Sequence, residues 1–188
     1  MVNWIHVRQS MVALTIAAAL LAPPAAAQQG GGATPAQPVN IQTTLANDVG
    51  NLSDKFTGLA RVMAGKYDWR PMQGVRSVAE VFNLIVGENR MLANLLTGAP
   101  GQGRGGMGGG TPITDPAQMQ EALKSSYATL RQAIAGLSDA DLNTSVRLFG
   151  QDTTKRGAAL MLLFDQHEHL GQSIAYARSN SVVPPWSK

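Results

Sequence analysis

Four stretches of the chain place apolar residues at intervals of three and four, the spacing of an amphipathic helix. They run from about 40 to 63, 77 to 97, 115 to 137 and 153 to 180. The first stripe consists of Leu45, Val49, Leu52, Phe56, Leu59 and Met63. Each helix must bury its apolar face against a partner. The strand signal is confined to Val146–Phe149. The pattern therefore predicts an all-α, up-and-down-type four-helix bundle.

Polar residues at the predicted helix starts support these boundaries. Ser77 and Glu80 have the spacing of a capping box. Asp115 is followed by proline, the usual combination of an N-cap and a first helical residue. Thr153 or Thr154 caps the last helix. One helical turn and a short extended piece are expected between the third and fourth long helices.

The first 27 residues have the layout of a secretory signal peptide. Arg8 precedes the uncharged run "MVALTIAAALLA", and Ala25 and Ala27 occupy the small-residue positions of a cleavage site. The apolar run is shorter than the roughly 20 residues of a membrane span. We therefore expect a signal peptide at 1–27, a flexible linker at 28–39 and one domain at 40–188. The mature protein would be exported, periplasmic or secreted, with no membrane span after cleavage.

The charge balance excludes a nucleic-acid-binding function. The chain has 15 Lys and Arg, or 14 without Arg8, against 12 Asp and Glu. No basic cluster is interleaved with aromatic residues. There is also no cysteine, so the exported domain must be stabilised by its core alone.

The glycine-rich stretch "GAPGQGRGGMGGGTP" contains Gly101, Gly103 and Gly106 in a formal G-x-G-x-x-G pattern. A dinucleotide-binding loop follows a strand within a βαβ unit, whereas this stretch follows a helix. We interpret it as a flexible connector. On sequence alone, deletion of Gly101–Gly110 is expected to change stability little.

Two segments resemble the DinB superfamily: "KYDWRPMQGVRSVAEVF" at Lys66–Phe82 and "HEHLGQSIAYARSNSVVPPWS" at His167–Ser187. The resemblance covers residues from about 40 to 187. These four-helix-bundle proteins include bacillithiol- and mycothiol-dependent transferases. Many relatives form dimers, so the resemblance is compatible with a homodimer.

The resemblance also implies a metal site with three histidines. One lies on the second helix, seven residues after the serine of "RS", and two lie four apart on the last helix. Carried onto this sequence, these positions are Leu84, Asp165 and His169. Leu84 cannot ligate a metal, so two candidate ligands remain.

Helical spacing limits which residue could join Asp165 and His169 as the third metal ligand. Asp165 and His169 are four residues apart and share a helix face. His167 lies about 200° around the helix from His169, so both cannot reach one ion. Glu88 lies one turn beyond Leu84 and, on this argument, would complete a poor triad.

The leading hypothesis from the sequence is an exported DinB-like protein with a degenerate metal site and a binding or structural role. Asp165 and His169 would form a hydrogen-bonded or ion-paired couple. Together with Leu84 and Tyr176 they would line a pocket for a small-molecule ligand. No cofactor is assigned under this hypothesis. The alternative is a transferase or hydrolase that depends on a divalent metal (Zn, Ni or Mn), with a third ligand from elsewhere.

Overall fold

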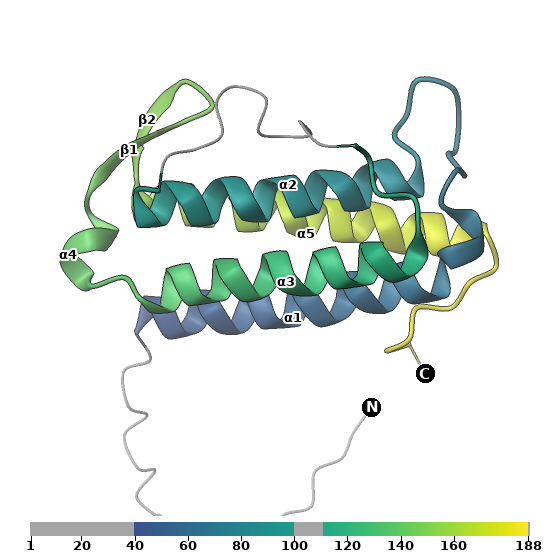
Figure 1. Ribbon diagram of the computed structural model, residues 1–188, viewed down its shortest axis with the longest axis horizontal. Helices are drawn as coiled ribbons and strands as arrows, with labels where there is room; N and C mark the ends of the chain where they lie inside the picture. Colours follow the sequence, from purple (N-terminus) through teal and green to yellow (C-terminus); the bar gives the residue numbers. More distant parts are fainter. Residues whose placement is uncertain (1–39, 100–110, 188) are drawn as a thin grey trace, which may run out of the picture. The chain divides into compact units, whose positions relative to one another are not determined.

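The computed structural model describes residues 40–99 and 111–187, which form a bundle of four long helices (Figure 1). The elements are α1 (Ile41–Val62), η1 (Ala64–Lys66), α2 (Val78–Thr97), α3 (Pro116–Ala135), α4 (Asp139–Leu142), β1 (Ser145–Leu148), β2 (Gln151–Thr154) and α5 (Lys155–Ser179). The predicted all-α four-helix bundle is confirmed. The predicted signal peptide, the linker and the G-x-G-x-x-G match lie outside the described residues. Within them, no helix is long and apolar enough to cross a membrane.

The helix starts are fixed by short polar side chains, as the sequence predicts. Ser77 and Glu80 form a complete capping box at α2. Asp115 caps α3 by accepting from the Gln118 backbone N–H, and Thr154 caps α5. The expected helical turn and extended piece are α4 and β1, and β1 pairs antiparallel with β2.

The core lies between the four long helices and is dominated by aliphatic side chains around an aromatic centre. Phe56 of α1 packs edge-on against Phe82 of α2, with ring centroids 6.3 Å apart. It also stacks on Tyr127 of α3 at 6.2 Å. These rings are almost completely buried and join three of the four helices. Leu84, expected in the apolar stripe of α2, is only half-buried and lies outside this core.

Side-chain hydrogen bonds reveal the direction of each helix. Near the start of α2, the Asn83 amide donates to the Ile113 carbonyl and accepts from the Ile113 N–H, both at 2.9 Å. The residues just before α3 therefore lie beside the start of α2, and the two helices run parallel; the predicted up-and-down connectivity, which would make them antiparallel, is wrong for this pair. Gln42 at the start of α1 donates to the Leu137 carbonyl after α3, so α1 and α3 are antiparallel. The end of α2 and the start of α3 consequently lie at opposite ends of the bundle (Figure 1).

This direction changes the expectation for the glycine-rich connection. The 20 residues of α2 span about 30 Å. Deletion of 101–110 leaves only 98–100 and 111–115, eight residues that reach at most about 26–29 Å when fully extended. We therefore expect the deletion to break the Asn83–Ile113 hydrogen bonds or unwind the end of α2. The free energy of unfolding, measured in urea, should fall by about 1–3 kcal/mol. Replacement of residues 101–110 by a Gly/Ser sequence of equal length should leave the free energy of unfolding unchanged. A deletion that does not lower the free energy of unfolding would contradict the argument that this connection must span the length of α2.

Candidate metal centre

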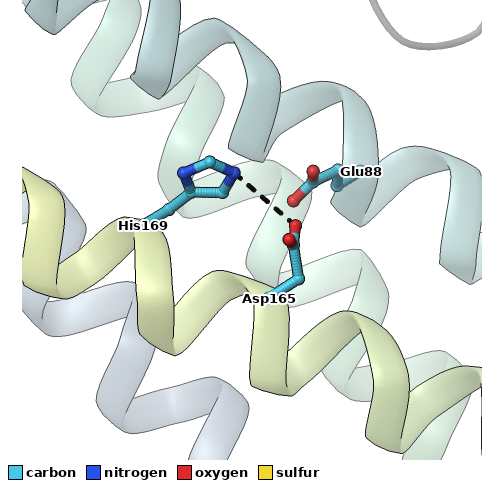
Figure 2. A group of neighbouring side chains, drawn as sticks. All are labelled: Glu88, Asp165 and His169. Carbon is cyan, nitrogen blue, oxygen red and sulfur yellow. Dashed lines mark ion pairs between the residues drawn. The ribbon is translucent and has the colours of Figure 1, made fainter.

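Helices α2 and α5 bring three potential metal ligands together (Figure 2). Glu88 comes from α2, and Asp165 and His169 come from successive turns of α5. One ligand atom from each lies within 4.8 Å of the other two. This proximity fits ligands of one divalent ion, whose bonds to such atoms are usually about 2.0–2.2 Å long. Two carboxylates and one imidazole thus form a candidate site for a divalent metal.

The structure places two of the expected residues in this group and adds a third. His169 Nε2 lies 3.6 Å from Asp165 Oδ2, a distance at which the two side chains form an ion pair only when the imidazole is protonated, so their predicted pairing stays a prediction. The proposal that Leu84 marks the third position is not matched by this group, which takes Glu88 one turn further along α2. Helical spacing within α2 alone does not show which of its turns faces Asp165. Asn89 contacts Gln166, and Arg76, earlier in the chain, contacts Tyr176 near the end of α5. Helix α5 therefore runs antiparallel to α2, and this packing decides which turn of α2 faces Asp165.

Glu88 is an acid in an environment that disfavours its charge. Only 3% of the residue is exposed, and its Oε2 has no hydrogen-bond partner among the described residues. Burial, together with the negative charge of Asp165, raises the pKa of Glu88 to about 8. An unpartnered buried acceptor costs stability. A proton or a bound cation would therefore stabilise this carboxylate. The sequence signal for its burial was its place in the apolar stripe, three residues after Ile85 and four before Leu92.

A buried polar network next to the three ligands joins α2, α3 and α5. Gln166 Nε2 donates to Asn89 Oδ1 at 2.8 Å, and Asn89 Nδ2 donates to Ser126 Oγ at 3.1 Å. The Tyr127 hydroxyl donates to Gln166 Oε1 at 3.1 Å. Asn89 and Gln166 directly follow Glu88 and Asp165 in the chain. The network therefore fixes the register of α2 against α5 at the candidate site.

His167 does not join the site, as the helical spacing predicts. Its ring points to α1, where Nε2 lies 2.9 Å from Asp48 Oδ2. Both side chains are substantially solvent-exposed, at 45% and 32%. An exposed pair of this kind contributes little to stability.

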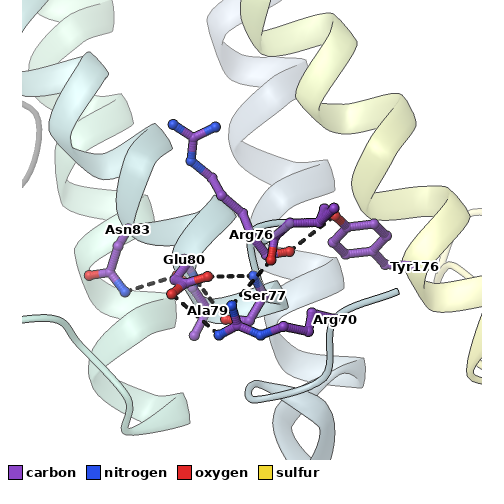
Figure 3. A network of polar contacts seen from close by, with 8 residues as sticks. Arg70, Arg76, Ser77, Ala79, Glu80, Asn83 and Tyr176 are labelled. Atoms are coloured by element: carbon purple, nitrogen blue, oxygen red, sulfur yellow. Dashed lines mark hydrogen bonds and ion pairs between the residues drawn. The ribbon is translucent and has the colours of Figure 1, made fainter. Parts of the chain in front are cut away.

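The second ring nitrogen of His169 faces a chain of polar groups that leads to the end of the bundle. His169 Nδ1 lies 2.9 Å from Gln172 Oε1, and Gln172 Nε2 donates to the Tyr176 hydroxyl at 2.7 Å. Tyr176 donates to the Arg76 backbone carbonyl at 3.1 Å (Figure 3). Trp69 packs edge-on against the Tyr176 ring, with centroids 5.2 Å apart. Tyr176 is thus buried beside the site, whereas its predicted role in a ligand pocket stays a prediction.

The turn before α2 is held by a separate set of contacts (Figure 3). The Ser77 N–H donates to Glu80 Oε2, and this bond holds the pKa of Glu80 below its ordinary value. Arg70 pairs with Glu80 at 3.4 Å. Glu80 therefore caps the start of α2.

The fold is a four-helix bundle, and α2 and α5 carry a candidate group of metal ligands. A model of the DinB superfamily matches residues 54–173, so the chain belongs to that superfamily and the resemblance is confirmed. The crystal structure of a DinB-like protein from Bacillus subtilis is similar, with a TM-score of 0.60 and 16% identity. The match covers 73% of this chain and 92% of that one, and it supports the fold. No curated protein matches the chain.

The raised pKa of Glu88 predicts how the stability of the metal-free protein depends on pH. Between about 4.5 and about 8, the folded protein keeps a proton on Glu88 that the unfolded chain releases. Stability should therefore be highest at the acidic side of this window and fall as pH rises, by at most about 1.4 kcal/mol per pH unit. Glu88→Gln mimics the protonated acid and cannot titrate, so the part of this pH dependence that comes from Glu88 should be lost. Urea unfolding with a chelator present, from about pH 5 to pH 8, measures the difference.

Glu80→Gln is the matched control. The pKa of Glu80 is lowered, so this group stays ionised throughout the window and its loss should leave the slope unchanged. Equal slopes for the original chain and Glu88→Gln would show that Glu88 is not a buried acid of raised pKa.

Proposed function

We propose that this protein is exported and binds one divalent metal ion through Glu88, Asp165 and His169. One observation carries the proposal: ligand atoms from two helices lie within 4.8 Å of each other, and one of them belongs to a buried carboxylate. Oε2 of that carboxylate has no hydrogen-bond partner among the described residues. Bound metal would supply the missing positive charge.

The ligand types narrow the choice of metal. Carboxylate oxygens suit Mn²⁺ and other hard cations, while imidazole suits Zn²⁺ and Ni²⁺. A mixed set of two oxygens and one nitrogen favours Zn²⁺ or Mn²⁺. Three protein ligands leave a coordination position for water, as in catalytic zinc sites. The ion would supply a Lewis acid and lower the pKa of that water.

This ligand set favours an altered metal site over a degenerate one. The hypothesis of a degenerate site with a binding or structural role rests on the absence of two histidines. Glu88 supplies a third ligand that this hypothesis lacked. Among metal-dependent activities, hydrolysis suits an exported protein better than thiol transfer, because low-molecular-weight thiols are chiefly cytosolic cofactors. The Asp165 side chain is 46% exposed, so a substrate could approach from solvent.

Metal titration of the purified, chelator-treated chain tests the proposal. Calorimetry with Zn²⁺ and with Mn²⁺ should show about one ion per chain for at least one of them. The bound ion should raise the melting temperature, since it binds the folded form. Glu88→Gln and His169→Gln should each weaken binding by more than the roughly 10–100-fold that loss of an outer hydrogen bond costs.

His167→Gln provides the control for this experiment. It removes an imidazole two residues from His169 that also lies beside a carboxylate, but on the α1 side of the helix. Its affinity should equal that of the original chain. No tight binding of either ion, or equal losses for the two histidine variants, would refute the proposed site.

Export is tested by where the protein is found and where it begins. Protein expressed in a bacterial host from the full-length gene should be recovered outside the cytoplasm, with Gln28 as its first residue. Leu20→Arg interrupts the apolar run and should keep the chain in the cytoplasm with the signal segment attached. Native protein that retains the signal segment in the cytoplasm would contradict export.

A further inference from the structure

In the hydrogen bonds that link His169, Gln172 and Tyr176 to the Arg76 carbonyl, the donor and the acceptor of each bond can be assigned. A backbone carbonyl can only accept, so the Tyr176 hydroxyl must give its one proton to the Arg76 carbonyl at 3.1 Å. The Tyr176 oxygen can then only accept from Gln172, 2.7 Å away. The Gln172 atom that faces Tyr176 is therefore its amide nitrogen. Its carbonyl oxygen faces His169 Nδ1 at 2.9 Å.

This polarity determines where neutral His169 carries its proton. Because Gln172 Oε1 can only accept, Nδ1 must be the protonated nitrogen and Nε2 the one with the free lone pair. The competing acceptor for the ring proton is Asp165 Oδ2. It lies 3.6 Å from Nε2, beyond ordinary hydrogen-bond distance. Nε2 is also the nitrogen that faces Asp165 (Figure 2).

We infer that Gln172 and Tyr176 are positioning residues that hold His169 in the Nδ1–H form, with Nε2 free to ligate a metal. The inference rests on the proposed function only for its consequence, which is that Nε2 ligates a metal. The position of the ring proton is a property of the metal-free chain. Metal-binding histidines generally donate the other ring N–H to an acceptor that fixes the tautomer. Here the acceptor is itself oriented by Tyr176, which Trp69 and the Arg76 carbonyl hold in place.

Nitrogen-15 NMR of the His169 ring in the metal-free protein tests the inference directly. The original chain should show a protonated Nδ1 and an unprotonated Nε2 when the ring is neutral. Tyr176→Phe frees the Gln172 amide to turn over, so the ring should shift toward Nε2–H. Zinc affinity should fall by about 10–100-fold in parallel. Gln172→Leu should act in the same way, whereas Gln172→Glu keeps an acceptor and should preserve the tautomer.

Tyr67→Phe is the matched control, because Tyr67 is also buried and donates to a backbone carbonyl, that of Ala60 at 3.0 Å. It should leave both the tautomer and the zinc affinity unchanged. A protonated Nε2 in the original chain, or an unchanged tautomer in both Tyr176→Phe and Gln172→Leu, would overturn the positioning role. Unchanged zinc affinity in these variants would overturn it too and leave the metal site standing. If Tyr176→Phe and Gln172→Leu shift the tautomer of His169 but the original chain binds no zinc, the positioning role stands and only the proposed metal-binding function is refuted.

Discussion

The hydrogen bond between the side chains of Gln166 and Asn89 sets the register of α2 against α5, on which the rest of the structure depends. It is 2.8 Å long, both residues are fully buried, and its loss would leave unpaired polar groups in the core. Apolar packing alone tolerates small sliding of one helix along another, whereas paired amides permit one register. That register sets Glu88 of α2 opposite Asp165 of α5. Core specificity and the candidate site therefore have a common origin.

The placement of Glu88 carries a cost that packing does not explain. A methionine or leucine at this position would continue the apolar stripe of α2 without a desolvation penalty. The chain instead buries a carboxylate beside a second carboxylate, which raises its pKa to about 8. Strongly perturbed acids occur preferentially at functional sites. Neutralisation by a cation offers a physical reason for this arrangement.

The sequence was sufficient for the fold because its main signals are local. Apolar spacing and the caps at Ser77, Asp115 and Thr154 specify the helices without reference to the rest of the chain. The third ligand could not be predicted in this way. Whether α5 faces Leu84 or Glu88 depends on pairing between residues 77 positions apart, which no single-helix argument contains. The parallel direction of α2 and α3 was missed for the same reason.

The polar chain behind His169 ends on a main-chain oxygen, that of Arg76. A substitution at position 76 changes the side chain but keeps this acceptor, provided that the backbone conformation holds. The side chains of His169, Gln172 and Tyr176, by contrast, bond to one another, so each hydrogen-bond donor among them must face an acceptor. In related sequences that share this geometry, changes at these three positions should therefore occur together, while position 76 varies independently.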